Sequence, residues 1–366
     1  MKPMLRIPFK MIPLCLALLA GLGTAVANDP GFRGRHTKEK TIRKEFNVNP
    51  DALLKIQNSY GNLVLNSWNE NRVVIEVHIT TNGNNEEKVQ QKLDEITVEF
   101  EADAAMVSAR THVARERSWG WWGNNNNVNM QINYTVNLPV KHSVHLSNDY
   151  GNITLDRIDG HAKISCDYGR LDLGELHGRN NELSFDYTSK SNIGYMRSGR
   201  ISADYSEYTI EKAGDLTLNT DYTKSRVLEM GNLIYSGDYG HIEVDEAGNV
   251  QGTGDYMDIR LGTLHGDVDL TADYGSIHID RMAADAGNVN IRTDYTGIRV
   301  GYDPAYAFDF EITSEYAGVK GLEDLTVQVS KERNSSRYYS GYHGAAGSGH
   351  SVRITGDYGN ITFNRN

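Results

Sequence analysis

Residues 149–173 read DYGNITLDRIDGHAKISCDYGRLDL, and the Asp-Tyr pair that occurs twice in this stretch recurs along the chain. From Tyr150 to Tyr295, consecutive tyrosines of the pair are 17 to 21 residues apart. The related pairs Ser59-Tyr60 and Glu315-Tyr316 extend the series at both ends. The tyrosines of the Asp-Tyr pairs are Tyr150, Tyr168, Tyr187, Tyr205, Tyr222, Tyr239, Tyr256, Tyr274, Tyr295 and Tyr358. Self-similarity at a steady period is typical of repeat proteins.

Apolar residues keep fixed places around each tyrosine. Around Tyr150, Val144 and Leu146 lie six and four residues before the ring, and Ile153 and Leu155 lie three and five residues after it. Spacing of two is the period of a β-strand, and the step across the tyrosine indicates a corner. Glycines mark this corner and a second one, so each repeat reads strand, turn, strand, turn.

Two short strands cannot bury a core alone, but stacked repeats build one continuous core. The sequence therefore predicts an all-β fold, a parallel β-solenoid (a single-stranded β-helix) with about 17 to 21 residues per coil. We expect a right-handed coil, because crossovers between parallel strands almost always have that hand. Eighteen residues are also three times six, so a left-handed hexapeptide helix is the alternative. Eleven coils about 4.8 Å apart would extend on the order of 50 Å.

The chain divides by composition into four parts. Residues 1–27 resemble a secretory signal peptide, with three cations, an apolar run and an Ala-Val-Ala cleavage site. Residues 28–44 are polar and basic and predict a flexible lead-in. Residues 45–141 predict a β-rich cap that holds the first coil and one helix, Glu86 to Ile96, because an open end would expose strand edges. The repeats occupy 142–366, with a loop insertion at 331–350 that is rich in Arg, Ser, Tyr and Gly.

Charge restricts the partners. The net charge is −11, and it becomes −14 once the three cations of the leader are removed. This balance argues against nucleic acid and against anionic lipid head groups, which both need a basic face. No later stretch is long and apolar enough for a transmembrane helix. One cysteine, Cys166, then remains, so no intrachain disulfide forms.

The run SYGNL, DYGNITL, DYGRLDL and DYGNITF, after a signal peptide and a β-rich segment with one helix, resembles the putative-adhesin β-strand-repeat family of exported bacterial proteins. The resemblance extends from about Glu45 to the end. It implies a β-strand-repeat fold and export, and it brings no catalytic motif and no cofactor.

The aspartates before the tyrosines would form a column along one edge of the stack. Carboxylates about 5 Å apart repel by roughly 1 kcal/mol even in water-like surroundings, so something must offset the repulsion. One interpretation is that each aspartate accepts backbone N–H groups of its own corner. The other is calcium bound between neighbours, with Asp204, Asp221, Asp238 and Asp255 as the candidate ligands.

The tyrosines would form a second column. Rings at strand spacing bury apolar area and favour offset contacts, which predicts a structural ladder. If the rings face outward, the same column could bind glycans.

Two aromatic clusters are candidate binding residues. Trp119, Trp121 and Trp122 lie in a Gly/Asn-rich connection, where they could be exposed for binding or could plug the end of the stack. Tyr338, Tyr339 and Tyr342 lie in the loop insertion, whose composition is that of a recognition loop or of a flexible insertion.

Catalysis is not expected. The acidic residues follow the repeat, whereas a catalytic site would break it at two or three adjacent coils, and common hydrolase and phosphate-binding motifs are absent. The sequence therefore favours a non-enzymatic, exported, adhesin-like module that presents an extended surface to a polymer or protein partner in the periplasm, at the cell surface or outside the cell. The alternatives are a periplasmic structural or stress-related envelope protein and, third, a polysaccharide-acting β-helix enzyme. We expect no cofactor.

Overall fold

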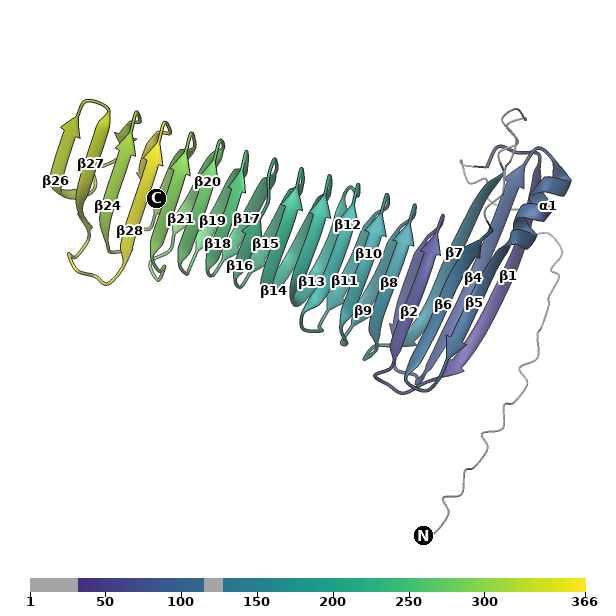
Figure 1. Ribbon diagram of the computed structural model, residues 1–366. Helices are drawn as coiled ribbons and strands as arrows, with labels where there is room; N and C mark the ends of the chain where they lie inside the picture. The colour runs from purple at the N-terminus through teal and green to yellow at the C-terminus, as the bar shows by residue number, and fades with distance from the viewer. Residues whose placement is uncertain (1–31, 115–127) are drawn as a thin grey trace, which may run out of the picture. The chain divides into compact units, whose positions relative to one another are not determined.

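The computed structural model describes residues 32–114 and 128–366 (Figure 1). Residues 34–366 form one compact unit. In the described residues, 29 strands join one open hydrogen-bonded sheet, and α1 (Glu86–Glu95) is the one α-helix. The predictions of an all-β chain and of a helix that begins at Glu86 are confirmed.

The strands that lead into the tyrosine corners pair side by side and form what we name the first ladder. Between β2 and β28 all its pairings are parallel, and identical repeat positions face each other, as in Asp167↔Asp186 and Asp186↔Asp204. In spatial order its strands are β2 (Leu53–Ser59), β8 (Ser143–Asp149), β10 (Ala162–Asp167), β12 (Asn181–Asp186), the second halves of β13 (Ser191–Asp204) and β14 (Glu207–Asp221), β16 (Leu233–Ser236), β18 (Val250–Asp255), β20 (Val268–Asp273), β22 (Val289–Asp294), β28 (Ser351–Asp357) and β24 (Phe308–Glu315).

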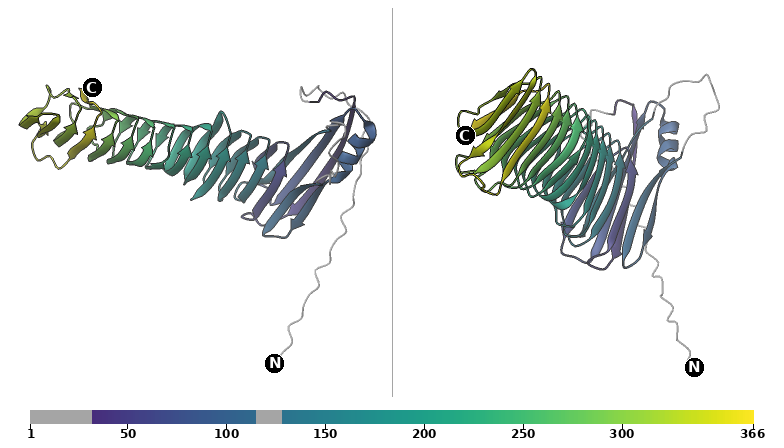
Figure 2. Two further views of the ribbon diagram at one scale, coloured as in Figure 1. Left: turned by 45° about the horizontal axis from the view of Figure 1, so that its top comes forward. Right: turned by 60° about the vertical axis from the view of Figure 1, so that its left-hand side comes forward.

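The strands that leave the tyrosine corners form the second ladder, which is also parallel from repeat to repeat. Its strands are β3 (Leu63–Trp68), β9 (Ile153–Ile158), β11 (Leu171–Leu176), the first halves of β13 and β14, β15 (Lys224–Met230), β17 (His241–Ala247), β19 (Asp258–Leu264), β21 (Ser276–Met282), β23 (Gly297–Tyr302), β29 (Ile361–Arg365) and β25 (Val319–Lys320). Figure 2 shows the repeats following one another along the unit.

The core lies between the ladders. Along most strands of the repeats buried and exposed side chains alternate, and the buried apolar residues of both ladders belong to one hydrophobic cluster. Cys166 lies in this cluster, where burial, and then the nearby Asp167 and Asp149, raise the pKa of its thiol to about 12. The thiol therefore acts as a small apolar side chain at neutral pH.

At the N-terminal end, five further strands and the helix extend the two ladders. Their bounds are β1 (His36–Asn47), β4 (Arg72–Gly83), β5 (Ile96–Ala102), β6 (Met106–Val113) and β7 (Asn129–Pro139). The first ladder continues as β2–β6–β5, and the second as β3–β7–β4–β1. The first repeat consists of β2 and β3, which pair on one side with β8 and β9. The five N-terminal strands therefore lie on the other side of this repeat.

The prediction of a flexible lead-in at 28–44 is wrong for residues 36–44. They belong to β1, which pairs antiparallel with β4 over twelve residues. The Lys40 Nζ donates to the carbonyls of Leu93 and Ile96 at 2.6 Å each and so ties β1 to the end of α1. Long-range pairing gives this polar segment an order that its composition does not predict.

The prediction of a loop insertion at 331–350 is wrong for most of its length. Residues 331–343 lie in a hairpin of β26 (Thr326–Arg333) and β27 (Ser336–His343), and β27 pairs antiparallel with β24. The last repeat in sequence does not lie at the end of the stack, because β28 lies between β22 and β24 and β29 lies between β23 and β25. The stacking order at this end therefore differs from the chain order.

The signal peptide predicted at 1–27 and the cluster of Trp119, Trp121 and Trp122 lie outside the described residues. Among the helices of the described part, none has the length and apolar character needed to cross a membrane.

Candidate functional site

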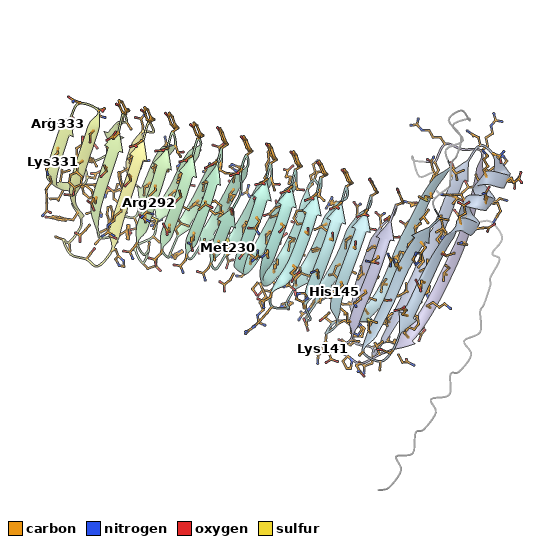
Figure 3. The ribbon with its side chains drawn as sticks, viewed as in Figure 1. Lys141, His145, Met230, Arg292, Lys331 and Arg333 are labelled. Atoms are coloured by element: carbon orange, nitrogen blue, oxygen red, sulfur yellow. The ribbon has the colours of Figure 1, made fainter. Side chains whose placement is uncertain are left out.

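A continuous column of tyrosine rings runs along the edge where the first-ladder strands end, and we name it the tyrosine ladder. Its order is Tyr60, Tyr150, Tyr168, Tyr187, Tyr205, Tyr222, Tyr239, Tyr256, Tyr274, Tyr295, Tyr358 and Tyr316. Neighbouring ring centroids are 4.6 to 5.3 Å apart and the planes differ by at most 8°. Figure 3 shows the row of side chains along one edge of the repeats.

The rings face outward. Each ladder tyrosine is between 42% and 60% exposed, with Tyr60 the least and Tyr316 the most. Because each inner ring is covered on both faces by its neighbours, the surface consists of ring edges and phenolic hydroxyls. A sugar cannot stack on an inner face at this spacing, and only the two terminal rings have a neighbour on one face alone.

The backbone at every ladder position is unusual. All twelve tyrosines have φ between 50° and 65°, in the left-handed region that costs an L-residue about 1–2 kcal/mol. Eleven of the tyrosine N–H groups donate to a carbonyl of the adjacent repeat, as from Tyr205 to Asp221 at 3.1 Å, and the Tyr316 N–H donates to the Ser335 carbonyl of the β26–β27 hairpin. Glycine or asparagine would make the same corner at lower cost, so the corner alone does not account for tyrosine at twelve positions.

At three corners the residue after the tyrosine, Ser206, Thr223 or Thr296, is buried and its hydroxyl bonds back to the corner. The Ser206 and Thr223 hydroxyls each donate to the carbonyl of the aspartate two residues before, both at 2.9 Å. The Ser206 N–H in turn donates to the Thr223 Oγ1 at 3.1 Å. These bonds lie under the ladder and hold the ring direction of successive repeats.

The surroundings raise the pKa of the phenol at five positions of the ladder. Desolvation raises the pKa of Tyr168, Tyr205, Tyr239, Tyr274 and Tyr358, and the neighbouring tyrosines and aspartates raise it further. No ladder hydroxyl bonds to another side chain or carbonyl in the described residues. The ladder therefore offers a row of hydroxyl donors and acceptors to solvent.

The aspartate column lies beside the rings. Its carboxylates do accept backbone N–H groups, but the prediction that these belong to the same corner is wrong, because the donors lie in the next repeat. The Asp221 Oδ1 accepts the Asp238 N–H at 2.8 Å, and the Asp238 Oδ1 accepts the Asp255 N–H at 3.0 Å, one repeat further along. Seven such bonds link adjacent repeats. Hydrogen bonds to backbone N–H groups offset the repulsion within the column.

Calcium at Asp204, Asp221, Asp238 and Asp255 stays a prediction. Within the described ranges, no group of three or more His, Cys, Asp or Glu side chains is arranged to hold a metal ion.

The three candidate tyrosines of the predicted insertion all lie on β27 and do not join the ladder. Tyr339 is only 8% exposed, with its hydroxyl donating to Glu332, so it belongs to the core rather than to a recognition surface. Tyr338 and Tyr342 are half-buried on the opposite face, and the Tyr338 hydroxyl donates to Glu311 at 3.2 Å. Tyr339 differs in exposure from the other two tyrosines because alternate residues of a strand face opposite sides.

A second feature was missed by the sequence reasoning. A hollow of about 740 Å³ lies over the outer face of the first ladder, from β5 to β13, at the end next to the helix. It is lined by Lys55, Arg110, Lys163 and Arg200 and by His145, which Figure 3 marks on β8. The outward strand positions could have been aligned in the sequence, but the chain positions that meet here are about a hundred residues apart.

Comparison with known proteins finds no matching family model and no matching curated protein. Among solved structures, a putative cell adhesion protein from Clostridium sporogenes covers 90% of this chain and 100% of its own at 11% identity and a TM-score of 0.20. A putative adhesin from Parabacteroides distasonis covers 88% and 97% at 10% identity and a TM-score of 0.30. A putative lipid binding protein from the same species covers 88% and 96% at 13% identity and a TM-score of 0.31.

The adhesin descriptions agree with the family that the repeat motifs resemble. TM-scores this low carry no argument about the function of this chain.

Proposed function

We propose that this chain is a non-enzymatic, exported binding module, adhesin-like in character, whose repeats form a right-handed parallel β-solenoid. Its tyrosine ladder is the extended surface that it presents to a polymer or a large protein partner. One observation carries the proposal: twelve half-exposed tyrosines occupy strained corners in one unbroken row.

The energies support a role beyond stability. Each stacked pair contributes about 0.5–1.5 kcal/mol, and each left-handed corner costs about 1–2 kcal/mol. The left-handed corner therefore offsets much of the stacking contribution, at a position where glycine would be unstrained. Exposed contiguous aromatic surface is typical of binding sites. Identical tyrosine side chains about 5 Å apart along a line suit a partner that is itself linear and repeating, which favours a polymer.

The carboxylates support a role without catalysis. The aspartates of the column repeat with the strands, and seven side chains of the column accept backbone N–H groups. A general acid or base needs an environment set apart from its neighbours, and this arrangement gives all of them much the same one.

The test is binding of the mature chain to arrays of glycans and of host matrix proteins. The variant Tyr205→Asn/Tyr222→Asn/Tyr239→Asn removes three rings with a residue that tolerates the left-handed corner. The control is Val327→Asn, which removes an apolar side chain, 39% exposed, on β26, outside the ladder. Binding that is lost in the triple variant and kept in the control supports the proposal. Binding that the triple variant leaves intact refutes it.

Protease treatment of intact cells tests the location. Loss of the chain from unbroken cells supports an outer-surface adhesin. Protection until the outer membrane is opened favours the alternative of a periplasmic envelope protein.

A further inference from the structure

The hollow on the first ladder gathers unpaired cations. Three of its basic side chains, Lys55, Arg110 and Arg200, have no ion pair and no side-chain hydrogen bond among the described residues, and the same holds for Arg179 and Arg197 beside it. Arg179 and Arg197 line a neighbouring hollow of about 920 Å³ that shares Glu182 and Arg200 with the first. We name the two hollows together the basic track.

The carboxylates of the basic track are largely engaged. Glu182 pairs with Lys163 at 2.7 Å, and Glu99 pairs with His112 at 3.0 Å. The Asp215 Oδ1 accepts the Asn232 side-chain amide at 2.7 Å. Six Lys/Arg side chains thus line the track with four Asp/Glu, in a chain whose net charge is −11.

The response of His145 agrees with a positive local field. Burial lowers the pKa of His145, and the neighbouring His161, Lys55 and Lys163 lower it further, against the opposite effect of Glu182. Remote carboxylates count for less, because at physiological salt charges more than about 8 Å away are largely screened.

A row of hydroxyls runs beside the cations. Lys55, His145, Lys163, Glu182 and Arg200 pair in register across the strands. Two residues further along each of four strands come Ser147, Ser165, Ser184 and Ser202, which also pair with one another. Two rows of different chemistry, both repeating at strand spacing, therefore line one hollow.

We propose that the basic track binds an anionic polysaccharide, with cations for its carboxylates and serines for its hydroxyls. The inference rests on the proposed function of a binding module, and it names a ligand class for a surface separate from the tyrosine ladder. The interspersed Glu99, Glu101 and Glu182 disfavour nucleic acid, whose phosphates are dense along the backbone. The lining of the two hollows also includes no Trp, Tyr or Phe, which disfavours a membrane surface.

The test measures fluorescence anisotropy of a labelled oligogalacturonate with the mature chain. The variant Lys55→Gln/Arg110→Gln/Arg200→Gln should weaken binding roughly tenfold and flatten its dependence on salt. The matched control, Lys224→Gln/Arg299→Gln/Lys320→Gln, removes the same charge from exposed positions of the second ladder and should bind within about twofold of the unmodified chain.

Four results would overturn the proposal: no binding by the unmodified chain, an equal loss in the control, binding of duplex DNA as tight as that of oligogalacturonate, or a preference for anionic vesicles. The triple-asparagine ladder variant separates the two sites. If this variant keeps oligogalacturonate binding, the basic track binds independently of the ladder. A failure of the basic-track proposal would then leave the proposed function of the ladder untouched, and a failure of the ladder proposal would leave the basic track untouched.

Discussion

Replacing Tyr205 tests whether the ladder stabilises the stack and at what cost. The ring lies between Tyr187, at a centroid distance of 5.1 Å, and Tyr222, at 4.8 Å, and its φ is 52°. Tyr205→Ala removes two stacked contacts worth about 0.5–1.5 kcal/mol each and leaves the left-handed corner strained. We expect the free energy of unfolding to fall by about 2 kcal/mol.

Three companion variants separate stacking from strain. Tyr205→Gly loses the same contacts but relieves the corner, so it should cost about 1 kcal/mol less than Tyr205→Ala. Tyr205→Phe keeps both contacts and should stay within about 0.5 kcal/mol of the unmodified chain. Tyr316→Ala, at the end of the ladder with one stacked neighbour at 4.8 Å, should cost about half as much as Tyr205→Ala.

The assay is urea unfolding followed by circular dichroism, together with amide hydrogen exchange. Repeat proteins can open locally, so exchange of the Tyr205 amide, which donates to the Asp221 carbonyl, reports the change where it occurs. Equal costs for the alanine and glycine variants would refute the strain argument. Equal costs at Tyr205 and Tyr316 would refute the stacking argument.

Two further predictions concern alkali and the last repeat. Stability should be level near neutral pH and fall as pH rises above about 10, because the pKa of Tyr205, Tyr239 and several other tyrosines is raised in the folded state, so the unfolded chain loses those protons first; a phenolate absorbance titration of the folded chain that shows ordinary tyrosine pKa values would contradict this. Deleting 351–366 should destabilise the C-terminal end, since β22 and β24 each lose their partner β28 and Tyr295 and Tyr316 lose Tyr358 between them. Amide exchange should then rise in 289–343 and stay unchanged in 143–222, whereas uniform protection would mean that β24 pairs directly with β22.

The local pattern determined most of the repeat region. Spacing of two set which residues are buried, and the Asp-Tyr corner set the register, because identical positions in successive repeats satisfy the same backbone and side-chain contacts. The pairing of Asp167 with Asp186 and then Asp204 therefore follows the alignment of the sequence on its tyrosines. The helix at Glu86–Glu95 was predictable for a similar reason, since Val89 and Leu93 have helical spacing and are both buried.

Contacts between distant segments decided the rest. Composition made 28–44 resemble a loose segment, but pairing with β4 makes residues 36–44 a strand, and a hairpin replaces most of the expected loop at 331–350. The strand β28 lies between β22 and β24, which both precede it in the chain. The repeats have similar sequences, so nothing in the local sequence of β28 distinguishes these partners from other repeat strands.

The two candidate surfaces divide in the same way. The column of twelve tyrosines could be predicted from the sequence, because the period of the repeat is local. The outward direction of the rings could not, since it follows from the left-handed backbone at each corner. The tertiary structure alone also brought Lys55, Arg110 and Arg200 to one hollow, because cap and repeat strands from distant parts of the chain meet there as neighbours in the first ladder.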